Sequence, residues 1–405
     1  MIDVVDNLLD FNAGRDPERL TIKYAKMRTS PYVFLRATCH LFYDRLSAND
    51  LPQDAPLGWI CGDLHLENFG SYKGENRLVY FDINDFDESA LAPVSWDLVR
   101  FLASIAVAAK TLRIGPRKAE LLSAQFIAAY CETLQTGKAT WIERDTAEGL
   151  VRHLLDDLKG ESRVAHLDKY SKRSKKTRSI ICDGLRALKA GKKDRERVIE
   201  WVNVFAKKRE NSDFFKVLDV ARRIAGVGSL GVARYVILVK GRGSPDTNYL
   251  LDLKESRPSS LEKHLDAITA QPAFASHAHR VVAVQTRMQA VAMAFLNPID
   301  KRTSTYVLRG IQPSENRVSL DDPDVQFEQI SGVITQMGRV VASAQLRSAG
   351  LQGSANADAL MAFGSARKIW QKSLLKVAQR CAVQNDADWK VFAGAYDLGA
   401  FNKLG

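Results

Sequence analysis

One stretch near the start of the chain constrains the fold more than any other feature. It reads Gly62-Asp63-Leu64-His65-Leu66-Glu67-Asn68-Phe69 and, after a short interval, Phe81-Asp82-Ile83-Asn84-Asp85-Phe86-Asp87. An Asp stands five residues before an Asn on an expected loop, and the β-like run 78–81 leads into a cluster of carboxylates. The pattern predicts a strand, a loop, a second strand and an acidic turn in close succession.

The side chains in this stretch are the types that phosphoryl transfer to a hydroxyl requires. Asp63 would accept or orient the proton of the attacking hydroxyl, a contribution of about 10² to 10⁴ in rate. Asn68 and Asp85 would hold Mg²⁺ on nucleotide phosphates, because Mg²⁺ prefers hard oxygen ligands. Asp82 and Asp87 are further candidates for metal contact. Ordinary surface turns also contain Asp and Asn, but the complete set at this spacing favours a functional site.

Length and composition indicate a globular protein with anionic partners. The 405 residues allow two or three lobes, and 46% hydrophobic with 26% charged residues is ordinary for such a protein. A net charge of +11 favours nucleotides, phosphorylated substrates, nucleic acid or an anionic membrane surface as partners. The five scattered cysteines fit a reducing compartment. With no visible signal peptide and no membrane-spanning segment, we expect a cytoplasmic protein that does not bind membranes.

Part of the positive charge is concentrated between residues 169 and 197. The residues are Lys169, Lys172, Arg173, Lys175, Lys176 and Arg178, then Lys192, Lys193, Arg195 and Arg197. Such a run is usually a solvated surface, and the alternative is an anion-binding patch. Nucleic-acid binding would favour interleaved aromatic residues for base stacking, and Tyr170 is the single aromatic close to the first run. Nucleic acid is therefore disfavoured as a partner.

A glycine-rich motif lies far downstream of the acidic turn. Residues 226–231 read G-V-G-S-L-G, which makes Gly226, Gly228, Ser229 and Gly231 candidate ligand-binding residues. The residues that follow are rich in Val, Ile and Leu, so we expect a strand and not the helix of a dinucleotide-binding turn. A glycine loop between two strands suits a lid whose backbone N–H groups meet phosphates. A plain hairpin turn is the alternative.

Lys254 ends the next β-like run and stands among apolar residues. This placement suits a lysine that reaches the phosphates of a nucleotide, whereas a solvent-facing lysine on an edge strand is the alternative. Such a lysine would require an acidic partner on a following helix, for which Glu262 is the candidate. The helix expected over 277–296 offers Gln285 and Gln289 but no acid.

Along the chain, the patterns are helical, then β-rich, then helical. We expect an N-terminal helical segment (1–54), the catalytic-loop and metal-binding part of a large lobe (55–160), a basic helical connector (161–215), a small lobe with the glycine loop (216–312) and C-terminal helices of the large lobe (313–405). A helix is expected over 96–109 with Ser95 as its N-cap. Residues 305–310 are a candidate hinge that reads the base.

These motifs resemble those of the protein-kinase-like superfamily, in its aminoglycoside and choline phosphotransferase branch. That branch carries G-D-x-x-x-x-N, then a D-F-D-like metal-binding turn, then a helix that starts with Trp/Tyr-Asp-Leu. Here they correspond to Gly62-Asp63 to Asn68, to Asp85-Phe86-Asp87 and to Trp96-Asp97-Leu98. More narrowly, the chain looks like a bacterial family catalogued as a domain of unknown function, with G-D-x-H-x-E-N-F-G, F-D-x-N-D-F-D-E and V-G-V-G-S-x-G.

The resemblance implies an α+β, two-lobed protein-kinase-like fold with a mostly helical large lobe and a small antiparallel sheet lobe. It also implies ATP and Mg²⁺ as cofactors, with Asp97 and His65 supporting the catalytic loop. The motif order is different, because the glycine loop and Lys254 follow the catalytic loop, and a helix over 333–349 resembles one that normally precedes it. Circular permutation is the simplest account, since it is tolerated where termini lie close together.

Taken together, the sequence predicts an ATP·Mg-dependent phosphotransferase that acts on a hydroxyl of an unidentified small molecule or protein. Transfer of AMP instead of phosphate is an alternative, because Lys254 lacks an obvious acidic partner. Two further hypotheses are a nucleotide-binding regulatory pseudokinase and a basic nucleic-acid-binding protein.

Overall fold

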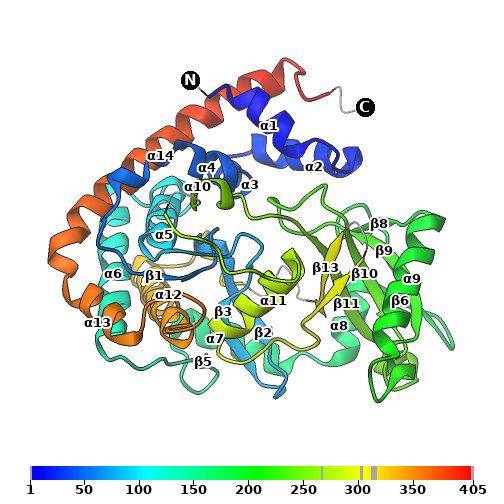
Figure 1. Cartoon of the computed structure of the whole chain (residues 1–405). Coiled ribbons are helices and arrows are strands. Elements are labelled where there is room, and N and C mark those ends of the chain that lie inside the picture. The colour runs from blue at the N-terminus through cyan, green and yellow to red at the C-terminus, as the bar shows by residue number, and fades with distance from the viewer. Residues whose placement is uncertain (1, 266–267, 302–303, 312–316, 403–405) are drawn as a thin grey trace.

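The computed structural model describes residues 2–265, 268–301, 304–311 and 317–402. A mostly helical part lies on one side of the molecule and an antiparallel sheet on the other (Figure 1). The order of helical, β-rich and helical segments along the chain agrees with the sequence pattern. The expected mixture of helices with small antiparallel sheets is confirmed.

The helical part contains the loop and the acidic turn of the first motif. Its helices are α5 (Ser95–Ala108), α6 (Pro116–Gln135), α7 (Gly149–Gly160), α12 (Phe327–Arg347), α13 (Ala357–Ser365) and α14 (Arg367–Asp397). Its strand β1 (Leu57–Ile60) pairs with β4 (Ala90–Pro93). A separate three-stranded sheet has the order β2 (Phe69–Lys73), β3 (Val79–Ile83) and β5 (Ile142–Glu143). The strands predicted before the loop and before the acidic turn are present as β1 and β3, and the strand β2 between them was not predicted.

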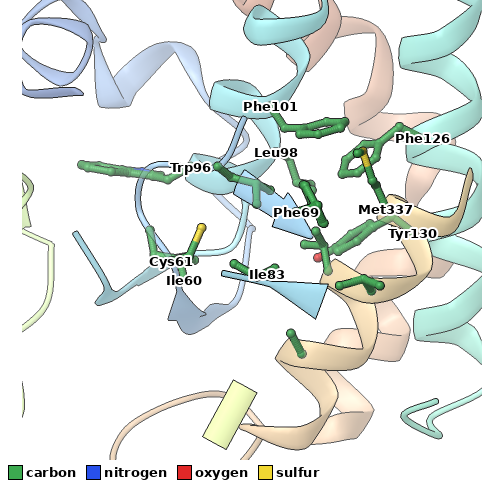
Figure 2. Packing of buried hydrophobic residues seen from close by; sticks show 14 of the residues in the cluster. Ile60, Cys61, Phe69, Ile83, Trp96, Leu98, Phe101, Phe126, Tyr130 and Met337 are labelled. Atoms are coloured by element: carbon green, nitrogen blue, oxygen red, sulfur yellow. The ribbon is translucent and has the colours of Figure 1, made fainter. Parts of the chain in front are cut away.

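The core of this part is built where β2 and β3 meet α5, α6 and α12. The ring of Phe101 stacks on Phe126 with 4.0 Å between centroids and meets Phe69 edge-on at 5.7 Å. Figure 2 shows these rings together with Tyr130 of α6 and Met337 of α12. Burial of each such side chain stabilises the fold by roughly 1.5–3 kcal/mol. The loop after β1 and the turn after β3 therefore start from a rigid support.

Helix α5 is buried on nearly all sides, which its apolar composition allows. The expected cap is displaced by one residue, because Ser95 is the first helical residue and Val94 precedes it without a side-chain capping bond.

The second part is a six-stranded antiparallel sheet. Its order is β12 (Asn297–Asp300), β13 (Thr305–Gly310), β11 (Tyr249–Ser256), β10 (Arg234–Val239), β9 (Val217–Arg223) and β8 (Ala187–Lys189). Helix α9 (Lys192–Ala206) packs on one face, with Val202 in the same apolar cluster as Ile237 and Leu251. Helix α8 (Arg163–Tyr170) covers part of the opposite face. Because side chains alternate along a strand, Lys254 projects from the face opposite α9.

Two expectations about this part were wrong. Residues 161–215 are no helical connector, since they contain the hairpin of β6 (Ser171–Arg173) and β7 (Arg178–Ile180) and the sheet strand β8. Their polar sequences carry too little alternation to predict strands. Residues 305–310 are no hinge but a strand inside the sheet, with β11 and β12 as neighbours. The boundary expected at 312–313 lies outside the described residues.

The helix expected over 277–296 ends earlier. Helix α11 (His277–Met288) stops at Met288, and the chain continues irregularly to β12. The backbone N–H of Ala294 donates to Lys73 O at 3.0 Å, and that of Glu75 donates to Ala292 O at 2.9 Å. This irregular segment therefore joins the sheet to the β2–β3 hairpin.

The N-terminal helices pack against the end of the last helix (Figure 1). They are α1 (Val4–Asn12), α2 (Pro17–Arg28), α3 (Pro31–Ala37) and α4 (Cys39–Arg45). Leu8 and Tyr24 share one apolar cluster with Phe392 and Phe401. The remaining elements are α10 (Glu262–Leu265) and the short turns η1 (Ala48–Asp50), η2 (Leu66–Asn68), η3 (Ser212–Phe215) and η4 (Pro245–Thr247). Among the described residues, no helix has the length and apolar character needed to cross a membrane.

Candidate functional site

A cavity of about 770 Å³ lies where the sheet meets the loops of the helical part. Candidate residues from both motif sets line it: Asp63, His65, Asn68, Asp85, Asp87, Gly226, Gly228 and Ser229. Gly231, Asp82 and Lys254 are not among its lining residues. The structure thus brings together two sets of motif residues that lie far apart in the sequence.

The loop that carries Asp63 is fixed at its entrance. Gly62 has a φ of +82°, and a Cβ at this position would lie 2.2 Å from the carbonyl oxygen of Glu88, so a side chain cannot be accommodated. The carboxylate of Asp97 accepts hydrogen bonds from the backbone N–H groups of Cys61 and Gly62, each at 2.9 Å. Burial raises the pKa of Asp97 to about 6. Asp97 therefore holds the start of the loop.

Asn68 connects the loop to the acidic turn. Its Oδ1 accepts the backbone N–H of Asp85 at 2.8 Å, and its Nδ2 donates to the carbonyl oxygens of Asp63 at 3.0 Å and Asp85 at 3.3 Å. These bonds set the distance between the candidate base and the candidate metal ligand. A carbonyl oxygen has a second lone pair, so the predicted magnesium contact of Asn68 is compatible with this arrangement.

A buried arginine that the sequence reasoning did not assign holds Asp63. Arg100 of α5 is fully buried and donates to Asp63 Oδ1 through Nε at 3.1 Å and Nη2 at 2.8 Å. Its Nη2 also donates to Leu35 O at 2.6 Å. A charged residue inside an otherwise apolar helix was the signal that could have identified it, because a buried charge requires a partner.

Lys254 meets the acidic turn at the edge of the cavity. Its ammonium lies 3.5 Å from Asp85 Oδ2 and forms an ion pair with Asp87. Burial alone would raise the pKa of Asp85, but Lys254, Arg309 and Arg234 together lower it. Burial and the adjacent Asp85 raise the pKa of Asp87. The two carboxylates are therefore unequal, and Asp85 is the one that stays ionised more readily.

The expected acidic partner of Lys254 was wrong. Glu262 instead accepts the backbone N–H of Ser259 at 3.1 Å, within its own turn. Gln289 donates to the carbonyl oxygen of Ile83 at 2.8 Å, while Gln285 donates to Gln289. The partner of Lys254 comes from a turn distant in sequence, which helical periodicity cannot reveal.

Asp82 occupies a different environment from the rest of the predicted set. It is buried in β3, and its Oδ2 accepts from Ala290 N at 3.0 Å and from Arg347 at 3.2 Å. These bonds hold the Asp82 carboxylate away from the cavity, which Asp82 does not line. Its predicted metal contact does not fit this position.

His65 supports the loop from within. It is buried, and its Nδ1 accepts the backbone N–H of Glu67 at 3.1 Å. Burial and the nearby cations Arg36 and Arg100 hold the pKa of His65 well below its usual range. The ring is therefore neutral and can act as this acceptor.

The glycine loop joins β9 to β10, so the predicted strand–loop–strand arrangement is confirmed. Its backbone is attached to the N-terminal helices, because Arg15 and Lys23 each donate to Gly228 O at 3.2 Å. A Cβ at Gly228 would lie 3.1 Å from Arg36 O, and Gly231 has a φ of +90°. The loop is thus held at the cavity by a segment that the sequence did not connect with it.

Acidic neighbours neutralise part of the basic run. Arg178 is buried and pairs with Asp168 and Asp246, and Arg195 pairs with Asp219. Arg173 also contacts Asp246. These three arginines of the run are therefore engaged in ion pairs within the chain.

Comparison with protein families shows to which family this chain belongs. A family model described as "Uncharacterized protein conserved in bacteria (DUF2252)" matches residues 15–395. The chain belongs to this family. Neither the curated proteins nor the solved structures include a match.

The donor set of the cavity suits magnesium bound together with phosphates. Among the described residues, no group of three or more His, Cys, Asp or Glu side chains is arranged to hold a metal alone. Mg²⁺ is commonly held by one or two carboxylates plus substrate phosphate oxygens. Asp85 and Asp87, with the amide oxygen of Asn68, provide oxygen donors of this kind.

Proposed function

We propose that this protein is an ATP·Mg-dependent phosphotransferase with a circularly permuted, two-lobed kinase-like fold. The observation that carries the proposal is the ion pairing of Lys254 with Asp85 and Asp87. Lys254 stands on the strand that follows the glycine-loop hairpin, and the carboxylates stand on the turn that follows the Asp63 loop. A phosphate-binding lysine and metal-binding acids lie together in such enzymes.

In this proposal each group has one task. Asp85 and Asp87 hold Mg²⁺, which when bound would neutralise charge on the phosphates, while Lys254 pairs with phosphate oxygens. Asp63, oriented by Arg100, accepts the proton of the acceptor hydroxyl. The loop around Gly228 and Ser229 covers the phosphates. The packing of the N-terminal helices on α14 supports permutation, because the ends of the chain meet.

AMP transfer and nucleotide-dependent regulation are two alternatives to phosphoryl transfer, and each can be distinguished from it by experiment. AMP transfer uses the same nucleotide and metal, so products of turnover distinguish it from phosphoryl transfer. A regulatory pseudokinase would bind nucleotide without turnover. Nucleic-acid binding is disfavoured by the pairing of Arg178 and Arg195 with acids.

Thermal unfolding with ATP, with and without Mg²⁺, tests the proposal. Ligand at about a hundredfold over Kd adds roughly 2.7 kcal/mol to the free energy of unfolding. We expect a Mg²⁺-dependent stabilisation that disappears in Asp85→Asn and persists in Glu262→Gln, because Glu262 lines the same cavity but does not contact Lys254. Stabilisation by no nucleotide, or equal behaviour of the two variants, would refute the proposed site.

A further inference from the structure

Three arginines of the sheet surround one carboxylate at the wall of the cavity. Asp252 of β11 is fully buried, and its carboxylate accepts hydrogen bonds from Arg234 Nε at 2.8 Å and from Arg234 Nη2 at 2.6 Å. Arg223 lies 2.9 Å from Asp252 Oδ2, and Arg309 lies 3.3 Å from it. All three arginines line the cavity, whereas Asp252 does not. The guanidinium groups therefore lie between Asp252 and the cavity.

The charges of this cluster do not balance. Three guanidinium groups surround Asp252, and arginine remains charged in proteins. With Lys254 and the carboxylates of Asp85 and Asp87 included, four cations meet three carboxylates. Their side chains are 6%, 8% and 10% exposed. A buried charge is costly unless another charge compensates it. The sheet side of the cavity therefore keeps one positive charge that no carboxylate of this group compensates.

Arg309 is the member best placed to bind something else. Arg234 uses its remaining nitrogen on Ala225 O at 3.1 Å, so its donors are committed to the fold. Within the described part of the chain, the hydrogen bonds of Arg309 are long, at 3.3 Å to Asp252 and 3.4 Å to Asn84 O. These lie beyond the usual range of strong hydrogen bonds. An incoming oxyanion could replace them with little loss.

The position of Arg309 determines which ligand group it would meet. Asn84 directly precedes Asp85, so the Arg309 guanidinium lies beside the candidate metal-binding turn. A group held here would be close to both a bound metal and Lys254.

We propose that Arg309, supported by Arg223 and Arg234, forms an oxyanion subsite that binds a phosphate group of the ligand on the sheet wall. Planar guanidinium groups recognise phosphate through paired hydrogen bonds. The inference rests on the proposed function in taking the ligand to be phosphorylated. It adds that the sheet wall receives the phosphate-bearing end of the ligand and not an apolar base.

Titration calorimetry with inorganic tripolyphosphate in EDTA tests the subsite without any metal. We expect wild-type protein to bind tripolyphosphate and Arg309→Gln to bind it at least about tenfold more weakly. Arg309→Lys keeps the positive charge but not the paired donors of the guanidinium, so it should also bind tripolyphosphate more weakly than wild type. Arg257→Gln is the matched control, because Arg257 lines the same cavity and is not in the cluster. Its loss should be less than about threefold.

The outcomes separate this inference from the proposed function. Equal losses in Arg309→Gln and Arg257→Gln would mean general attraction and overturn the subsite, as would absence of tripolyphosphate binding to wild type. If Arg309→Gln fails to fold, wild-type affinity in Arg309→Lys overturns it. Adenosine is the second probe, and adenosine binding that depends on Arg309 would overturn the subsite by showing that a base occupies the wall. Loss of ATP·Mg binding in Asp85→Asn tests the proposed function independently.

Discussion

The guanidinium of Arg100, buried inside α5, holds the carboxylate of Asp63 at 2.8 Å. The arginine side chain is completely inaccessible, while that of Asp63 is 21% exposed. The pair therefore joins the helical core to the cavity. Because Arg100 also donates to Leu35 O, its orientation is fixed before any ligand binds.

Replacement of Arg100 should be costly for stability. Arg100→Gln leaves the Asp63 carboxylate without its buried partner, and loss of one member of such a pair costs about 3–5 kcal/mol. We expect a loss of stability at the lower end of this range, because Asp63 is partly exposed. Urea denaturation measures the loss. Arg380→Gln, from the exposed pair with Asp50, should cost less than about 1 kcal/mol. Similar losses in the two variants would contradict a structural role for Arg100.

Two glycines should respond oppositely to alanine. Gly62→Ala places a Cβ 2.2 Å from Glu88 O in a left-handed conformation, so we expect a loss of more than about 2 kcal/mol. Gly332→Ala lies inside α12 with no described atom near the added Cβ, and should gain roughly 0.5–1 kcal/mol. Thermal unfolding compares both variants. A neutral Gly62→Ala would show that the loop entrance adapts.

A buried histidine predicts how stability depends on pH. His40 stacks on Phe11 at 3.5 Å, and burial together with Lys23 lowers the pKa of His40 to about 2. In the unfolded chain the same group titrates near 6.5. The unfolded state thus binds more protons below that pH, and stability falls as pH decreases. Between pH 7 and pH 5 the loss should be about 2 kcal/mol.

Urea denaturation across this pH range measures the contribution of His40. His40→Phe keeps the stacking and removes the titration, so its stability should fall less steeply with decreasing pH than that of wild type. The exposed His153 is the control, and His153→Phe should keep the wild-type slope. An unchanged slope in His40→Phe would show that the imidazole is not held neutral.

Local patterns predicted the elements of the site but not the connections between them. The β-like runs around the glycine motif and the β-like run that ends at Lys254 were sufficient to predict strands where β9, β10 and β11 lie. The helical spacing of the apolar residues after Ser95 was sufficient to predict α5. Both signals arise within one element, so a single sequence contains them.

Contacts between distant segments were not predictable in this way. The partner of Lys254 was expected on a following helix at Glu262, but the structure provides Asp85 and Asp87 from a remote turn. The attachment of the glycine loop to Arg15 and Lys23 likewise depends on tertiary packing. Asp82 and Asp85 are the same residue type three positions apart, and they differ because Asp82 lies within β3 whereas Asp85 lies in the turn after it.

Removal of the ammonium of Lys254 should affect nucleotide and metal in opposite directions. Lys254→Met keeps most of the side-chain volume but leaves Asp85 and Asp87 without their shared cation. We expect ATP affinity in EDTA to fall at least about tenfold, because a charged hydrogen bond to phosphate is lost. Mg²⁺ alone should bind more tightly than to wild type, since no ammonium competes for the carboxylates.

Calorimetric titrations with ATP and with MgCl₂ measure these two effects separately. Lys263→Met is the matched control, because Lys263 lines the same cavity but pairs with Asp44 and is 59% exposed. Its affinity for both ligands should stay close to that of wild type. If Lys254→Met weakened ATP binding no more than Lys263→Met does, the lysine would be a structural counter-ion of the turn. Unchanged Mg²⁺ affinity would instead remove Asp85 and Asp87 as the metal ligands.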